Sequence, residues 1–169
     1  MPLNKEGIAQ LKFDLRSNAK RYAQDTFGQR VGGDCGTACC MAGWCLRREI
    51  GEQKFTNAVD DLTWMTQFVW QRRCIFVGAR QLGITLLPDT DICRGVPQIF
   101  MGHSHWPLDL WRRYSNAMTA FPNSDHHAMV EVACDALDRM DEYGDIAALP
   151  AAKSVEYGLS AIEEVLLCR

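Results

Sequence analysis

The stretch GGDCGTACCMAGWC, residues 32–45, decides how this chain of 169 residues is divided. Its two leading glycines supply backbone angles that other residues resist, so they indicate a turn. Asp34 then suits the N-cap of a helix that runs to about Ile50 and ends before Gly51. Small residues four apart in that helix let a second helix approach closely. The stretch therefore predicts a turn followed by a helix in a helical core.

Apolar residues in steps of three and four along most of the remaining chain indicate further amphipathic helices. Their expected limits are Asn4 to Gly28, Thr56 to Gly83, Ser124 or Asp125 to Gly144, and 152 to 167. Between 85 and 123 the sequence holds four of the six prolines, and short helices are expected around Ile99 and Trp111. We predict a mainly α fold, a single compact orthogonal bundle of five to six helices with an irregular Pro-containing middle region, in one domain over 1–169.

Composition and charge restrict the function classes. The net charge is −3 with acidic and basic residues interspersed, so no global field draws the chain to nucleic acid or anionic lipid. No stretch approaches eighteen apolar residues, and the first twenty contain no apolar signal region. We expect a soluble, cytoplasmic protein without a membrane partner, in which the eight cysteines are free thiols, metal ligands or a catalytic group.

The cysteine segment has three interpretations, and the first is that its thiols only fill the core. Cysteine is among the most buried residues and behaves there as a small hydrophobic side chain. Burial raises the pKa of a thiol and leaves it inert. Under this interpretation the protein needs no cofactor.

The second interpretation is a catalytic thiol. Cys35 follows Gly–Gly–Asp at the expected start of a helix, where backbone N–H groups favour a thiolate. His127 is the candidate base, and Asp125 or Asp145 is the candidate residue that orients it. The predicted activity is that of a cysteine-dependent hydrolase or transferase using acyl transfer, although the sequence shows no complete catalytic set.

The third interpretation is a zinc-stabilised structural module. Zinc prefers four thiolate or imidazole ligands, which Cys35, Cys40, His103 and His105 would supply. Their spacing is unlike that of a zinc knuckle, because no second cysteine pair follows in Cys-x-x-Cys form.

A partner-binding surface is predicted in the segment HSHWPLDLWRRY, because aromatic and arginine side chains are enriched at the energetic centres of protein interfaces. The candidate residues are His103, His105, Trp106, Trp111, Arg112, Arg113 and Tyr114. In the alternative, the two tryptophans close the bundle and the arginines lie in water. Three arginine pairs would also permit contact with phosphates, but nucleic-acid binding is not predicted.

The segment CGTACCMAGW, residues 35–44, resembles the CGTxxCxAGW motif of small proteins from phages and bacterial mobile elements. The similarity extends over about residues 33–140, through ARQLGI, QIFMGHSHWP and HHAMVEVACDAL in that order, with an insertion at 55–74. The matching residues are Cys35, Gly36, Thr37, Cys40, Ala42, Gly43 and Trp44. The resemblance favours Cys35 and Cys40 as the paired thiols and implies a small accessory protein.

These observations lead to one main hypothesis of function. The resemblance, the aromatic and arginine residues and the incomplete catalytic set together favour a small soluble accessory protein that acts by protein–protein interaction. Its specific form is an inhibitor of a host defence or regulatory complex. The partner and the oligomeric state stay open at this point.

Overall fold

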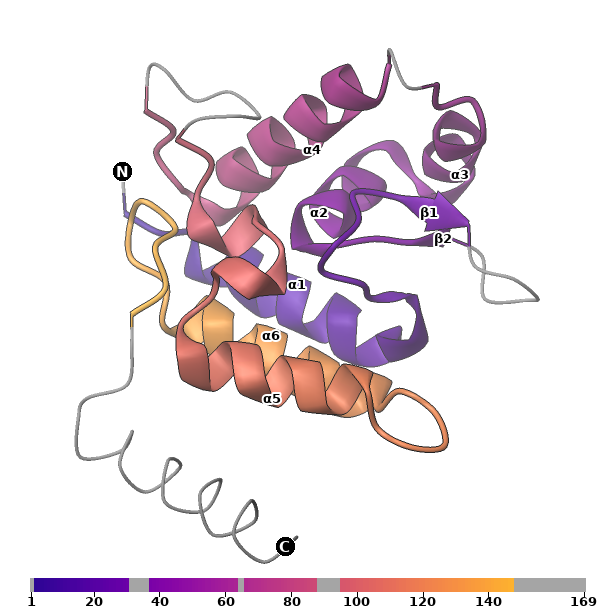
Figure 1. Cartoon of the computed structure of the whole chain (residues 1–169). Helices are drawn as coiled ribbons and strands as arrows, with labels where there is room; N and C mark the ends of the chain where they lie inside the picture. The colour runs from indigo at the N-terminus through magenta and orange to yellow at the C-terminus, as the bar shows by residue number, and fades with distance from the viewer. Residues whose placement is uncertain (1, 31–36, 64–65, 88–94, 148–169) are drawn as a thin grey trace, which may run out of the picture.

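Helices α2 (Met41–Ile50) and α4 (Gln67–Leu82) pack against each other on one side of the molecule, at the top of the view in Figure 1. The computed structural model describes residues 2–30, 37–63, 66–87 and 95–147. Small residues permit the close approach of these two helices. A Cβ atom added at Gly78 would lie 2.9 Å from the Phe100 ring and 3.4 Å from the Cα atom of Ala42. Seven consecutive residues of α2, from Met41 to Arg47, are buried.

A second pair of helices lies on the other side of the molecule. Helices α5 (Leu108–Met118) and α6 (His126–Asp138) pack against each other, and α1 (Lys5–Ser17) runs between the two pairs and contacts both (Figure 1). Helix α3 (Glu52–Asp60) lies beside α2. The elements join one core of buried apolar side chains, in which Leu11, Phe55 and Leu137 are 0 to 2% exposed.

Three helix ends follow local signals that the sequence predicts. Asn4 caps α1 by accepting the Gly7 N–H at 3.1 Å, and Asp125 caps α6 by accepting the Ala128 N–H at 2.9 Å. Gly83 ends α4 in a left-handed conformation with φ +73°. The backbone N–H of Asn4 also donates to the Leu82 carbonyl at 2.8 Å, so the residue that caps α1 also holds the start of α1 against the end of α4.

The first two helices are shorter than predicted. Helix α1 ends at Ser17 rather than near Gly28, and a single turn of 3₁₀ helix, η1 (Ala19–Arg21), follows it. Helix α2 begins at Met41, whereas the sequence predicts a helix from Asp34. The prediction is wrong for the described residues 37–40, which are not helical. Ahead of α2, the two-residue strand β2 (Thr37–Ala38) pairs antiparallel with the two-residue strand β1 (Gln29–Arg30).

Backbone pairing explains both corrections. The Cys39 N–H donates to the Arg21 carbonyl at 3.1 Å, and the Cys39 carbonyl accepts from Ala23 at 3.2 Å. The Cys40 N–H donates to the Thr26 carbonyl at 2.6 Å. Residues 21–26 and 39–40 therefore satisfy each other's backbone groups, and neither segment needs to continue a helix.

The predicted helix from Thr56 to Gly83 is two helices. Between α3 and α4, the Thr63 and Thr66 hydroxyls each accept the other residue's N–H, at 3.3 and 2.9 Å, and this reciprocal turn breaks the helix. Helix α6 stops at Asp138 rather than Gly144, because Asp141 instead accepts the N–H groups of a tight turn. The predicted helix at 152–167 lies outside the described residues.

The predicted mainly α class is confirmed. The described residues contain six α-helices, and their strands are only two residues long. The expected short helices around Ile99 and Trp111 are the 3₁₀ turns η3 (Gln98–Phe100) and η4 (His103–His105) and the longer α5. No helix in this part of the chain has the length and apolar character needed to cross a bilayer.

Gly43→Ala is predicted to destabilise the protein although alanine favours helices. The added Cβ would lie 2.6 Å from the Cys39 Cβ and 3.0 Å from the Phe27 carbonyl oxygen. Overpacking of this kind costs about 1 to 3 kcal/mol, and the gain in helix propensity offsets about 1 kcal/mol of it. Urea denaturation should show a lower free energy of unfolding, whereas the exposed Asn116→Ala should change it by less than about 0.5 kcal/mol.

Candidate functional site

The described thiols lie in the core. Cys39, Cys40 and Cys45 are each 0% exposed, and Cys74 is buried beside them. Burial raises the pKa of Cys40 to about 11 and that of Cys45 to about 12. Neutral thiols of this kind are poor nucleophiles, which supports the packing interpretation for these four residues.

Cys35, the proposed nucleophile, lies outside the described residues. The helix that was expected to start beside it begins at Met41 with Cys40 as its N-cap. The electrostatic reason for choosing Cys35 is therefore wrong, because the N–H groups that would favour a thiolate are those of residues after Cys40.

His127, the proposed base, is exposed in the first turn of α6. It lines a shallow hollow of about 350 Å³ together with residues 16–21. Neither of the two aspartates proposed to orient His127 forms a hydrogen bond with it among the described contacts. Asp125 caps α6, and Asp145 lies in the turn that follows that helix. Among the described side chains, none forms a hydrogen bond with His127.

The proposed metal ligands are not brought together. Cys40 is buried under α2, His105 is exposed, and His103 faces Asp25. Cys35 lies outside the described ranges. Within those ranges, no group of three or more His, Cys, Asp or Glu side chains is placed to share a metal ion.

A histidine–aspartate pair at the surface was missed by sequence reasoning. His103 Nδ1 lies 2.8 and 2.9 Å from the two carboxylate oxygens of Asp25, and the His103 N–H donates to the same carboxylate at 3.2 Å. Because a carboxylate only accepts, Nδ1 carries the proton in this pair. The imidazole also lies on the Tyr114 ring, with centroids 4.6 Å apart. The pair fixes the ring and joins two segments 78 residues apart.

The predicted partner-binding segment is divided between the core and the surface. Trp106 is 4% exposed and Tyr114 is 1% exposed, with their rings in edge contact at 5.7 Å. The alternative interpretation, in which Trp106 and Trp111 close the bundle, therefore holds for Trp106 but not for Trp111, and neither Trp106 nor Tyr114 can reach a partner. Arg113 forms an ion pair with Asp135 at 2.7 Å, while Trp111 and Arg112 face outward.

Helix α5 also carries an outward apolar row, which we call the outer stripe of α5. It consists of Leu108, Trp111 and Met118, which are 58%, 37% and 37% exposed. Their steps of three and seven place them on one side of the helix. The adjoining side, with Leu110 and Tyr114, is buried in the core. The outer stripe contains Trp111 of the predicted partner-binding segment and two further residues of α5, Leu108 and Met118, that the sequence analysis did not select.

Helix α4 carries a second surface of this type, within the segment that the sequence analysis predicted as one amphipathic helix from Thr56 to Gly83. Phe68, Val69 and Phe76 are 55%, 71% and 43% exposed. Arg72 and Arg73 are exposed between them. A count of turns along this helix would have shown that these residues oppose its buried side, which contains Trp70 and Val77.

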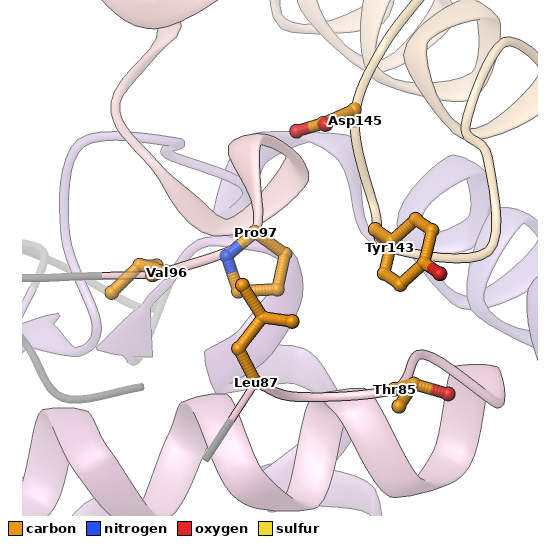
Figure 2. A pocket seen from close by; sticks show the side chains of 7 residues that line it. Thr85, Leu87, Val96, Pro97, Tyr143 and Asp145 are labelled. Carbon is orange, nitrogen blue, oxygen red and sulfur yellow. The ribbon is translucent and has the colours of Figure 1, made fainter. Parts of the chain in front are cut away.

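A hollow with a volume of about 410 Å³ lies between the end of α4 and the turn after α6 (Figure 2). Figure 2 shows the side chains of Leu87 and Pro97 close together at its centre, while the Tyr143 hydroxyl points away from them. Its rim borders residues 88–94, which lie outside the described ranges, so no ligand is assigned to it.

Comparison with known proteins gives no family. No family model matches the chain, and neither a curated protein nor a solved structure is significantly similar to it.

Raised thiol pKa values predict a loss of stability at alkaline pH. The Cys45 pKa is near 9 when unfolded and about 12 when folded, so its contribution is complete below pH 9 and is lost as the pH rises toward 12. Between pH 9 and 11, Cys45→Ala should lose stability less steeply than the unaltered protein, by up to about 1.4 kcal/mol per pH unit. Val77→Ala, a core truncation without a titrating group, should keep the original slope in urea denaturation.

The Asp25–His103 pair is predicted to couple two distant segments. A double-mutant cycle with Asp25→Ala and His103→Ala should give a coupling energy of about 1 kcal/mol at pH 7, because each single change leaves the other partner unpaired. His105→Ala, in the same 3₁₀ turn but exposed, should show no coupling to Asp25→Ala. A coupling energy of zero for the first pair would contradict this assignment.

Proposed function

We propose that this protein acts by binding another protein and that the outer stripe of α5 forms part of the contact. The observation that supports this is the second apolar side of α5. One side, with Leu110 and Tyr114, is buried in the core, and on the adjoining side Leu108 is 58% exposed while Trp111 and Met118 are each 37% exposed. Arg112 lies beside them.

The composition of this surface suits an interface. Tryptophan and arginine are the side chains most enriched at interface positions where truncation costs most of the binding energy. Apolar residues at steps of three and four are the usual anchors of a helix in a partner's groove. The cysteine-dependent alternative needs a reactive thiol within reach of a base, and burial raises the pKa of the described thiols Cys40 and Cys45.

The finer form of the proposal is an accessory protein of the phage or mobile-element type, acting in the cytoplasm as an inhibitor of a host defence or regulatory complex. It rests on the resemblance of residues 35–44 to the CGTxxCxAGW motif. An inhibitor of this kind needs a rigid surface and no reaction chemistry, which agrees with the buried thiols.

Trp111→Ala is predicted to weaken partner binding by about thirtyfold or more, which corresponds to a central interface residue. The measurement is affinity purification from producing cells, followed by titration of the recovered partner against the purified variant. Leu108→Ala and Met118→Ala should each weaken binding in the same direction.

Phe13→Ala provides the matched control, because Phe13 is 65% exposed on α1, away from α5. It should bind the partner as the unaltered protein does. A triple variant of the outer stripe that keeps its circular dichroism spectrum and melting temperature, and still binds the partner at full strength, would overturn the proposal.

A further inference from the structure

The outward face of α4 combines large apolar side chains with unpaired positive charge. Val69 and Phe76 are seven residues apart and so lie on the same side of the helix, about 10 Å from each other. They are 71% and 43% exposed, and Phe68 beside them is 55% exposed. Side chains of this size at such exposure are costly to leave in water when they lie together.

Three arginines accompany these apolar residues. Arg80 forms an ion pair with Glu49, and the Arg72 guanidinium lies over the Phe76 ring, 5.3 Å from its centroid. Neither Arg72 nor Arg73 has a carboxylate partner among the described residues. Helix α4 itself contains no aspartate or glutamate, so its outward face carries one sign of charge.

A small cavity adjoins this face. It has a volume of about 150 Å³ and is lined by Gln71 and Ile75 of α4, by Phe27, and by residues of the 96–105 segment. Gln71 and Ile75 both lie on the side of α4 that turns toward residues 96–105, and Ile75 follows Arg72 by three positions, so the cavity opens at the Arg72 edge of the outward face. A cavity of about this volume accommodates a benzene-sized apolar group.

We propose that the outward face of α4 binds an acidic amphipathic helix of a partner protein. Its apolar side chains would cover Val69 and Phe76, one of them would enter the cavity beside Ile75, and its carboxylates would meet Arg72 and Arg73. Charge complementarity selects an acidic partner, because like charges opposite this face would repel. The spacing of two turns between Val69 and Phe76 selects a helix.

Nucleic acid fits this face less well. Affinity for a phosphate backbone grows with the number of contacts that displace counterions, and this face offers two unpaired guanidinium groups. Exposed valine and an apolar cavity would add nothing to phosphate contacts. The proposal concerns a different surface from the outer stripe of α5 and does not depend on it.

The probe is a fluorescein-labelled synthetic peptide of about sixteen residues, with leucines in steps of three and four and glutamates at the flanking positions. Fluorescence anisotropy with the full-length protein should show saturable binding. Arg72→Glu combined with Arg73→Glu should weaken it at least tenfold, and Val69→Ala combined with Phe76→Ala should do the same at constant net charge.

Three controls make the result specific. Lys5→Glu with Lys20→Glu, an equal charge change at two exposed lysines outside the outward face of α4, should leave peptide binding within twofold. A peptide with lysines in place of its glutamates should not bind. The triple variant of the outer stripe of α5 should bind the acidic peptide normally, so failure of the proposed function and failure of this inference are distinguishable.

Two outcomes would overturn the proposal. One is equal binding of the acidic peptide by the unaltered protein and by the folded arginine double variant, or no binding at all. The other is tighter binding of a fluorescent single-stranded oligonucleotide than of the peptide, lost in the same arginine variant, which would assign this face to nucleic acid.

Discussion

The side chain of Gln24 holds the irregular half of the molecule together. It is 2% exposed, its carbonyl accepts from the Tyr22 hydroxyl at 2.7 Å, and its amide donates to the carbonyls of Ile99 and Met101 at 3.0 and 2.7 Å. The backbone N–H of Gln24 donates to the Tyr114 hydroxyl at 3.0 Å. A buried amide left without these partners would cost about 1 to 3 kcal/mol for each lost group, so every partner is held in place.

The segments that Gln24 joins have little regular structure of their own. Residues 18–28 contain one short 3₁₀ turn, η1, and residues 96–106 contain only two such turns. The same two segments are joined a second time at the surface by Asp25 and His103. Together these contacts position α5, because Tyr114 belongs to that helix and contacts both Gln24 and His103.

Local signals in the sequence were enough to predict the helix ends at Asn4, Gly83 and Asp125. Each depends on a side chain or a backbone angle within a few residues, which the sequence displays directly. The end of α1 was not predictable in this way. Ala19 and Tyr22 continue its apolar spacing, yet the backbone there pairs with Cys39, a choice that only the tertiary structure makes.

The break between α3 and α4 was missed for a similar reason. Apolar residues keep helical spacing across it, and only the reciprocal hydroxyl bonds of Thr63 and Thr66 interrupt the helix. Such bonds depend on the local geometry as well as on composition.

For the candidate partner-binding surface, the sequence shows the residue types but not which way each side chain faces. Aromatic and arginine residues near 103–114 were predicted to form an interface, but composition does not say which of them face the core. Trp106 and Tyr114 turned inward, while Trp111 and Arg112 turned outward. The partner of His103 lies 78 positions earlier, and no local spacing connects it to Asp25.

The two apolar sides of α5 have a consequence for how this helix is held. If α5 rotated about its own axis, the outer stripe could be buried in place of Leu110 and Tyr114. Burial of apolar surface alone therefore distinguishes poorly between these orientations of the helix. Polar contacts remove that ambiguity. The carboxylate of Asp109 meets Arg139 at 2.6 Å, with both side chains largely buried, and the Tyr114 hydroxyl meets Gln24. These two contacts fix the rotation of α5 about its axis, and so they determine that the outer stripe is the apolar row that faces the solvent.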